Sequence, residues 1–304
     1  MSQTPDGPAM QVEDLRKHYP LRGSIFSRVT GQVKAVDGVS FTLRRGETLA
    51  IVGESGCGKS TLARAMMRLE EPTSGRVLLE GKDMASADAK ELFALRRHLQ
   101  MIFQDPYSSL NPRMTAGDIV REPLVIHRLG NRAEREERAR TLMRSVGLSD
   151  EMMGRYPHEF SGGQRQRIGI ARALALEPNI IVADEPVSAL DVSIRAQVLN
   201  LLDDLQQALD VAYVFISHDL GVVRHVADDV MVMYLGRCVE QGPRDAVFDA
   251  PRQDYTRQLL SAIPALEPTP AGGVRLRWRF GAQGGAEAGT EVATDTGASA
   301  LAVV

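Results

Sequence analysis

Short apolar runs alternate with longer stretches of helical periodicity along most of the chain. The apolar runs predict strands over residues 11–19, 34–43, 47–52, 180–183, 212–216 and 229–234, with a loop over 20–32. Helices are predicted over 62–69, 132–146 and 194–208, and the pattern is mostly helical from about 90 to 160. After a β-rich opening, strands and helices alternate. This order indicates an α/β fold whose mostly parallel sheet is covered on both faces.

The composition is that of a soluble globular protein. Of the 304 residues, 43% are hydrophobic and 25% are charged, and a net charge of −3 does not indicate a nucleic-acid-binding surface. The longest apolar runs, 180–183 and 230–235, are far shorter than the ~18 residues of a membrane span. The polar start of the chain lacks the apolar core of a signal peptide. Cys57 and Cys238 are far apart, which fits a reducing cytoplasm and gives no metal-type spacing.

Both ends of the chain are predicted to be flexible, over 1–9 and 268–304. Beyond residue 267 the chain is rich in Gly, Ala, Thr and Pro, which cannot bury enough surface to become ordered. Within this tail, VRLRWRF (274–280) alternates basic and apolar residues, and an edge strand or a sticky tail is favoured over a functional contact. The charged run 132–146, with Glu134/Arg138 and Glu136/Arg140 at i,i+4 spacing, is interpreted as a solvated helix face.

A glycine-rich loop follows the predicted strand 47–52 and precedes a helix. GESGCGKS, from Gly53 to Ser60, fits G-x-x-x-x-G-K-[ST], in which backbone N–H groups surround phosphates at a helix N-terminus. Lys59 would supply charge to the β- and γ-phosphates, and Ser60 a hydroxyl ligand for Mg²⁺. Cys57 is interpreted as a small space-filling residue rather than a thiol whose pKa is lowered by the helix N-terminus. The candidate nucleotide-binding residues here are Gly53, Ser55, Gly56, Cys57, Gly58, Lys59, Ser60 and Thr61.

Two carboxylates, Asp184 and Glu185, end the apolar strand that begins at Ile180. In a parallel sheet this end lies beside the phosphate loop. Asp184 is therefore predicted to hold Mg²⁺ through its water shell, and Glu185 to orient or deprotonate the attacking water. An apolar strand that ends in two acids is weak evidence alone, but downstream of a phosphate loop it becomes strong.

A third segment, FSGGQ, precedes a helix with the sequence RQRIGIARALAL. Ser161 would cap this helix, and Gly162 and Gly163 permit close backbone approach to an anion. Alone, the segment favours a plain helix cap. Just ahead of Asp184, it resembles the signature motif of ABC ATPases, usually written LSGGQ, with Phe160 in place of Leu.

The resemblance extends over about residues 10–264. Gln104 resembles the Q-loop glutamine, Asp191 ends a segment similar to the D-loop, His218 resembles the switch histidine, and Tyr19 the aromatic residue that stacks on adenine. The resemblance implies a P-loop NTPase (RecA-like) fold with a mostly parallel sheet core, an antiparallel β subdomain and an inserted α-helical subdomain over about 90–160. It also implies an ATPase domain over 10–245 and a C-terminal extension over 246–267.

The same resemblance implies the roles at an ATP site. Glu185, His218 and Gln104 would be catalytic, and Ser60, Gln104 and Asp184 would bind Mg²⁺. Tyr19 and Asp191 would contact ATP. In this family two such domains close head to tail, so Ser161, Gly162, Gly163 and Gln164 would serve the ATP bound by the opposite subunit.

Three longer segments, 103–115, 158–174 and 183–202, resemble the ATPases of dipeptide, oligopeptide and nickel importers, in particular their second ATPase. Residues 251–264 are similar to the C-terminal motif of that group, with Gln253-Asp254-Tyr255 in place of His-Pro-Tyr. Some members carry a C-terminal cysteine cluster for an iron–sulfur centre. No cysteine follows Cys238, which excludes such a cluster in this sequence.

The resemblance also implies partners and a location. We expect ATP and Mg²⁺ as cofactors, two transmembrane permease subunits, a paralogous second ATPase, an extracytoplasmic substrate-binding protein acting indirectly, and no nucleic acid. The chain would lie at the cytoplasmic face of the membrane. A homodimer stays possible, and the substrate stays open among dipeptides, oligopeptides, glutathione and nickel. A non-transport ABC protein and an exporter are less favoured, because zinc-type cysteines, a second ATPase and membrane spans are absent from the sequence.

Overall fold

The computed structural model describes residues 7–22, 29–261, 264–268 and 274–278. Its centre is a six-stranded sheet in the order β10-β9-β3-β8-β7-β6. The strands are β3 (Thr48–Val52), β6 (Leu99–Ile102), β7 (Ile180–Asp184), β8 (Ala212–Ser217), β9 (Asp229–Tyr234) and β10 (Arg237–Pro243). All neighbouring strands are parallel except β9 and β10. The mostly parallel sheet predicted from the sequence is confirmed.

A second, antiparallel sheet has the order β2-β1-β4-β5. Its strands are β1 (Met10–Arg22), β2 (Val29–Leu43), β4 (Ser74–Leu79) and β5 (Lys82–Asp83). The loop predicted over 20–32 is wrong in part, because Pro20 pairs with Gln32 and Leu21 with Gly31. The pairing of β1 with β4 ends at Arg16, so beyond it β1 has only β2 as a described neighbour. An edge position of this kind tolerates a proline, which has no N–H to donate.

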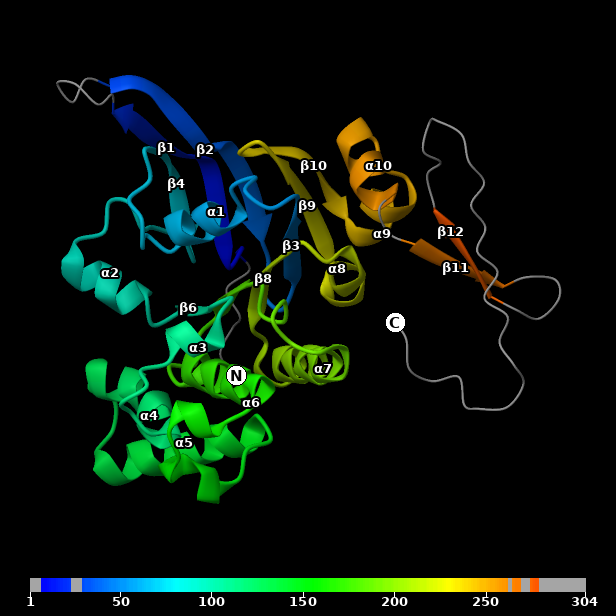
Figure 1. Cartoon of the computed structure of the whole chain (residues 1–304). Helices are drawn as coiled ribbons and strands as arrows, with labels where there is room; N and C mark the ends of the chain where they lie inside the picture. Colours follow the sequence, from blue (N-terminus) through cyan, green and yellow to red (C-terminus); the bar gives the residue numbers. More distant parts are fainter. Residues whose placement is uncertain (1–6, 23–28, 262–263, 269–273, 279–304) are drawn as a thin grey trace.

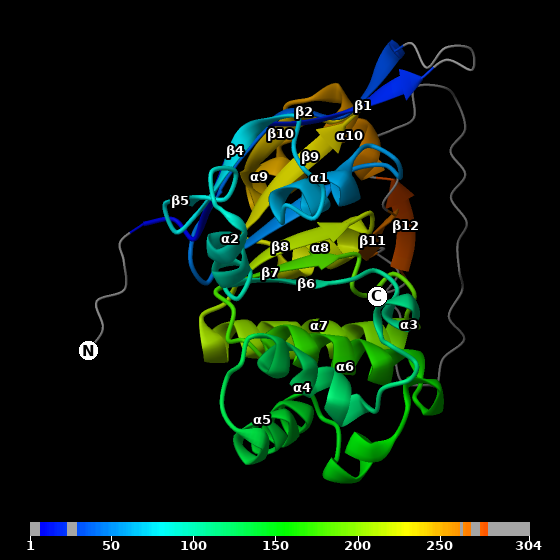
Figure 2. The same cartoon turned by 90° about the vertical axis from the view of Figure 1, so that its left-hand side faces the viewer.

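Helices cover both faces of the central sheet (Figures 1 and 2). They are α1 (Lys59–Met66), α2 (Ala89–Leu95), α3 (Pro106–Ser109), α4 (Ala116–Ile126), α5 (Arg132–Ser145), α6 (Gly162–Leu174), α7 (Val192–Leu209), α8 (Leu220–Val226), α9 (Arg244–Asp249) and α10 (Asp254–Ser261), with 3-10 turns at Asp150–Gly154 and Pro157–Glu159. Figure 2 shows α1 between the two sheets and α6 and α7 on the opposite side of the central sheet, with α4 and α5 farther out.

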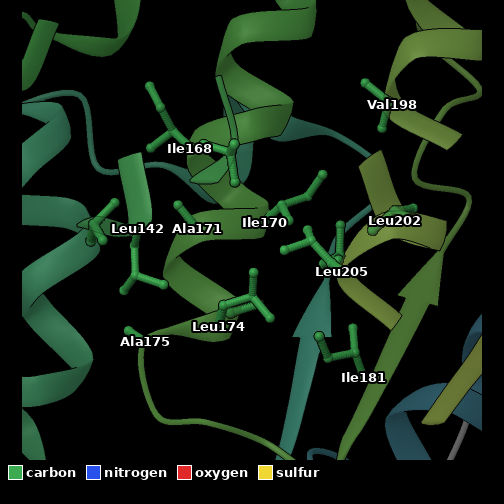
Figure 3. Packing of buried hydrophobic residues seen from close by; sticks show 14 of the residues in the cluster. Leu142, Ile168, Ile170, Ala171, Leu174, Ala175, Ile181, Val198, Leu202 and Leu205 are labelled. Carbon is green, nitrogen blue, oxygen red and sulfur yellow. The ribbon is translucent and has the colours of Figure 1, made fainter. Parts of the chain in front are cut away.

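The alternation of side chains along each buried strand creates this layering. On β3, Leu49 and Ile51 join the hydrophobic cluster that contains α1, whereas Ala50 and Val52 join a cluster with α8, α9 and α10. Figure 3 shows the third cluster, in which Ile168, Ile170, Ala171 and Leu174 of α6 pack between Leu142 of α5 and the α7 residues Val198, Leu202 and Leu205. Full burial of each large apolar side chain contributes roughly 1.5–3 kcal/mol, so α6 is firmly held between α5 and α7.

One local prediction in the helical region needs correction. The stretch 90–160 contains a strand, β6, whose four residues pair in parallel with β7. Within α5, the Glu134 carboxylate accepts from the N–H of Asn131 as part of a helix cap, and Arg138 pairs with Glu177 at 2.7 Å. Of the two i,i+4 spacings in this helix, only Arg140 and Glu136 form an ion pair among the described residues, at 3.3 Å.

After α10, two short strands, β11 (Pro264–Pro268) and β12 (Val274–Trp278), pair antiparallel. β12 covers most of the alternating segment 274–280. Residues 1–6 and 279–304, which belong to the ends predicted to be flexible, lie outside the described residues.

Candidate active site

The glycine-rich loop leaves the C-terminal end of β3 at Val52 and enters α1 at Lys59. Two of its glycines have backbone conformations and neighbours that exclude a side chain. A Cβ on Gly53 (φ 153°) would lie 2.3 Å from the carbonyl oxygen of Met233, and a Cβ on Gly58 (φ 109°) would lie 2.0 Å from that of Ala35. The loop is therefore seated against β9 and β2 by close backbone packing.

Lys59 is 5% exposed, and its ammonium group turns back toward its own loop. It donates hydrogen bonds to the carbonyl oxygens of Gly53, at 2.7 Å, and Glu54, at 2.9 Å. A buried ammonium group requires such partners. The result is a positive charge held at the mouth of the loop, beside the N-terminus of α1.

Asp184, 4% exposed at the end of β7, lies next to the start of α1. Its Oδ1 accepts a hydrogen bond from the hydroxyl of Ser60 at 3.1 Å. Burial raises the pKa of Asp184 above its ordinary value, and the hydrogen bond from Ser60 acts in the opposite direction. The structure thus brings together two of the residues predicted to bind metal, through oxygen atoms of the kind that Mg²⁺ prefers.

Glu185 holds two of the other predicted residues around one carboxylate oxygen. Its Oε2 accepts from the side-chain amide of Gln104 at 2.9 Å and from Nδ1 of His218 at 3.1 Å. The backbone of Glu185 has φ 48°, which is uncommon for a residue with a side chain. This conformation is held because the N–H of Glu185 donates to Ile216 O and its carbonyl accepts from the Ser188 hydroxyl.

The signature segment lies at the start of α6, away from this cluster on the opposite side of the sheet from α1 (Figure 2). Ser161 is the N-cap, and its hydroxyl accepts from the N–H of Gln164 while the Gln164 side chain accepts from the N–H of Ser161. Ser161 and Gly162 are exposed. Gly163 is buried, and a Cβ there would lie 2.3 Å from Cγ2 of Ile194 on α7. Close helix packing is therefore a second reason for glycine at this position, beyond approach to an anion.

Three further predicted residues have different surroundings. Asp191 precedes α7, is exposed and makes no side-chain cap bond. The hydroxyl of Tyr19 donates to the carboxylate of Glu70, and burial, followed by that bond, raises the pKa of Tyr19. Cys57 is 6% exposed, and burial raises the pKa of its thiol although nearby Lys59 acts to lower it. The structure thus supports the space-filling interpretation of Cys57 over the lowered-pKa alternative.

Sequence reasoning missed the turn between β9 and β10, which also forms part of the seat of the loop. The N–H of Gly236 donates to the carbonyl of Cys57 at 2.9 Å, and a Cβ on Gly236 would lie 2.5 Å from Lys34 O. The signal is a glycine in a Tyr-Leu-Gly turn after a buried strand. Nothing in the sequence alone pairs that turn with residue 57.

A phosphate-binding loop at a strand–helix junction, beside a strand that ends in two carboxylates, defines a P-loop nucleoside triphosphatase. The family model for ABC transporters matches residues 36–188, and a second model, the C-terminal region of oligopeptide/dipeptide transporters, matches 239–279. The chain belongs to the ABC transporter family, and it is an ABC ATPase with a nucleotide-binding domain.

Relatives share most of the chain. It is 59% identical over 86% of its length to a probable peptide ABC transporter ATP-binding protein of Sinorhizobium fredii, of which it covers 74%. It is 56% identical, again over 86%, to the dipeptide transport ATP-binding protein DppF of Escherichia coli, of which it covers 78%. A dimeric ATP-binding cassette solved in a post-hydrolysis state with ADP and Pi superposes with a TM-score of 0.69 at 30% identity, covering 77% of this chain and 98% of that one. Among the described residues, no helix is long and apolar enough to cross a membrane.

Proposed function

We propose that this chain hydrolyses ATP to power import of dipeptides or oligopeptides through a separate pair of membrane permeases. The observation that carries the hydrolytic role is the carboxylate of Glu185 at the end of β7, held by Gln104 and His218 beside the phosphate loop. The peptide substrate is supported by the C-terminal region matched over 239–279 and by the peptide and dipeptide transport proteins that the chain resembles.

In the proposal, the phosphate loop binds ATP through its backbone N–H groups and the N-terminus of α1. Lys59 leaves the carbonyls of Gly53 and Glu54 to pair with the β- and γ-phosphates. Tyr19 stacks on adenine, and its bond to Glu70 fixes the orientation of the ring. The remaining loop residues, Ser55, Gly56, Cys57, Gly58 and Thr61, shape the cradle.

Ser60 and Asp184 would hold Mg²⁺, and Gln104 would sense it. The fit rests on the 3.1 Å contact between the Ser60 hydroxyl and the Asp184 carboxylate, since two oxygen donors this close suit a hard cation. No cluster of three His, Cys, Asp or Glu side chains suited to a metal occurs among the described residues. In the proposal, oxygen atoms of the nucleotide phosphates supply the remaining ligands. The bound Mg²⁺ would neutralise charge on the transferred phosphoryl group.

Glu185 acts on the attacking water as a general base or an orienting group. Its side chain is 14% exposed, whereas that of His218 is 55% exposed and therefore open to a ligand. Because a carboxylate only accepts, the Nδ1 of His218 carries the proton in their bond. To donate to the γ-phosphate, His218 would either carry a proton on Nε2 as well or rotate its ring so that Nδ1 leaves Glu185.

The signature segment 161–164 would complete the ATP site of a second ATPase, because it lies apart from its own phosphate loop (Figure 2). Asp191 is exposed at the N-terminal end of α7, the end at which Ile194 packs against Gly163. It would contact the opposing subunit. We propose a heterodimer with a paralogous ATPase, placed by the permeases at the cytoplasmic face of the membrane. An extracytoplasmic binding protein would deliver the substrate.

A surface groove on the helical region suits a permease helix. It is lined by Arg113, Met114, Asp118, Arg121, Glu122, Val125, Ile126, Arg132 and Arg135. Val125 and Ile126 are 52% and 55% exposed, so the groove combines exposed apolar side chains with charged ones. Val125→Asp should abolish co-purification with the permeases and leave ATP binding intact. Leu209→Asp, at an equally exposed position on α7, is the matched control.

The substrate is tested in proteoliposomes that contain this chain, its two permeases and the second ATPase. We expect ATP-dependent uptake of a labelled dipeptide with the binding protein present, and loss of uptake with Lys59→Ala. Uptake of glutathione or nickel without dipeptide uptake would show that the proposed substrate is wrong, while the proposed role as the ATP-hydrolysing subunit would stand. Absence of ATP hydrolysis in every combination would overturn the proposal.

A further inference from the structure

The C-terminal extension contacts the phosphate loop through Tyr255 of α10. The hydroxyl oxygen of Tyr255 accepts a hydrogen bond from the backbone N–H of Glu54, at 3.3 Å. Tyr255 belongs to the segment Gln253-Asp254-Tyr255, which the assignment of the ATP site leaves without a role. The contact joins residues 201 positions apart in the chain.

The N–H of Glu54 and the carbonyl of Gly53 belong to one peptide group. That carbonyl accepts from the ammonium group of Lys59 at 2.7 Å. In a trans peptide the N–H and C=O point in opposite directions, and no described peptide bond is cis. Tyr255 and Lys59 therefore hold opposite sides of one peptide plane in the phosphate loop.

Tyr255 is itself fixed from two directions. Its ring packs on that of Tyr234, the last residue of β9, with centroids 4.3 Å apart. The start of α10 is tied to β10, because the carboxylate of Glu240 accepts from the N–H groups of Arg252, at 2.7 Å, and Gln253, at 3.1 Å. Leu260 at the far end of the helix is buried in the cluster that contains Val52 of β3. The hydroxyl is thus presented to the loop by a rigid support.

We infer that Tyr255 is a positioning residue for ATP binding, which fixes the orientation of the Gly53–Glu54 peptide and so keeps the phosphate loop in the conformation that receives the phosphates. The inference rests on the proposed function, since it assumes that this loop binds the phosphates. Tyr255 acts through the loop and does not touch the reacting atoms, so it affects nucleotide affinity more than the chemical step. Glu185, Gln104 and His218 lie at other strand ends and keep their mutual contacts.

Coupling of this kind is reciprocal. If α10 favours the binding-competent loop, bound nucleotide must favour the docked α10 by the same factor. Nucleotide should therefore slow amide hydrogen exchange in α10, over Asp254–Ser261, although the helix belongs to the C-terminal extension.

The test is Tyr255→Phe in the full chain, assembled with its partners for kinetics. This change keeps the ring that packs on Tyr234 and removes the hydroxyl. We expect KM for ATP to rise about 2- to 10-fold, the effect of one neutral hydrogen bond, with kcat unchanged within about twofold. Tyr234→Phe, which removes a neighbouring hydroxyl from the same ring pair, should leave KM unchanged.

Two readouts separate positioning from a general structural effect. The unfolding midpoint without nucleotide should be the same in both Phe variants, and ADP should slow exchange in α10 of the wild type but not of Tyr255→Phe. If the wild type binds ATP and Tyr255→Phe has the same KM, the inference is overturned and the proposed function stands. If the wild type itself binds no nucleotide, the proposed function fails first.

Discussion

Two helices of this ATPase, α1 and α6, have glycines at or just before their first residues, yet their N-termini differ. The N-cap of α1 is Gly58, which makes no side-chain cap bond, and the first residue, Lys59, is buried. The N-cap of α6 is Ser161, whose hydroxyl is paired with Gln164 in a capping box, and both Ser161 and Gly162 are exposed. Neither helix has an acidic residue in its first turn, so each keeps the positive end of its dipole.

This difference suits a site that is divided between two subunits. At α1, backbone N–H groups without a side-chain cap are available to phosphate, and the surrounding shape is fixed by close packing within the chain. At α6, the N–H of Gln164 is already satisfied by the Ser161 hydroxyl before any phosphate arrives. An anion brought by another subunit would displace this bond, which agrees with the head-to-tail closure proposed above.

The largest effect is expected on the α1 side, where the proposed base lies. Glu185→Gln keeps the size of the side chain and removes the charge that activates water. ATP hydrolysis by the assembled transporter should fall about 100- to 10,000-fold, the usual contribution of general-base catalysis. ATP binding, measured by equilibrium dialysis, should persist. Glu177→Gln, at an exposed surface ion pair with Arg138, is the matched control. Near-normal turnover of the Glu185→Gln variant would remove Glu185 from catalysis.

A second change, at the N-terminus of α6, separates helix capping from phosphate contact. Ser161→Asp preserves a good N-cap, so the unfolding free energy of the isolated chain should change by less than about 0.5 kcal/mol. In the assembled transporter, the new carboxylate would face a phosphate. Like charges ~4 Å apart repel by about 4 kcal/mol at an effective dielectric constant of ~20. Hydrolysis should therefore fall more than about tenfold.

The control for this experiment is Asn131→Asp, which adds the same charge to a capping box at the start of α5. It should leave hydrolysis unchanged. A Ser161→Asp variant that hydrolyses ATP normally would mean that Ser161 only caps its helix, as the segment alone suggests.

The contacts within the candidate site were largely predictable, because the residues that make them lie at the C-terminal ends of parallel strands. The loop after β3 and the acids after β7 come together for that reason, and the short distance between Ser60 and Asp184 agrees with it. The fold class was predictable from the alternation of strands and helices. Each of these signals is a short local segment of the sequence. The parallel sheet brings the segments together in space, because the C-terminal ends of its strands lie at one edge.

What the sequence could not predict depends on pairing between distant segments. β6 has only four residues and becomes a strand because β7 lies beside it. Pro20 and Gly31 are typical of a loop, but the long hairpin of β1 and β2 places them in strands. Tyr255 reaches Glu54 only because α10 is anchored by Glu240 on β10. None of these contacts leaves a periodic or motif-like pattern in the chain.

A smaller effect concerns stability on the α1 side. Burial raises the pKa of Asp184 in the folded protein above its value in the unfolded chain. The ionised carboxylate therefore lowers stability at neutral pH, and this penalty is lost as the pH falls through the raised pKa toward the pKa of the unfolded chain. Asp184→Asn cannot ionise, so it should raise the unfolding midpoint of the nucleotide-free chain at pH 7, with a gain that diminishes as the pH falls. Asp204→Asn, at an exposed position of α7, should show no gain. A gain that grows on acidification would contradict the raised pKa.

The smallest effect is expected at Cys57, where burial competes with the positive end of α1. Burial raises the pKa of the thiol, and the charge of Lys59, whose ammonium group lies 3.8 Å from Sγ, opposes this rise without reversing it. Cys57→Ala should therefore keep ATPase activity within about twofold and cost about 1 kcal/mol of stability, a typical value for a point mutation. In a Cys238→Ala background, alkylation of Cys57 at neutral pH should be much slower in the folded chain than in urea. Rapid labelling that MgATP blocks would show instead that the positive end of α1 lowers the pKa of the Cys57 thiol more than burial raises it. The N-terminus of α1 would then stabilise a thiolate in its own loop, as it is proposed to stabilise phosphate.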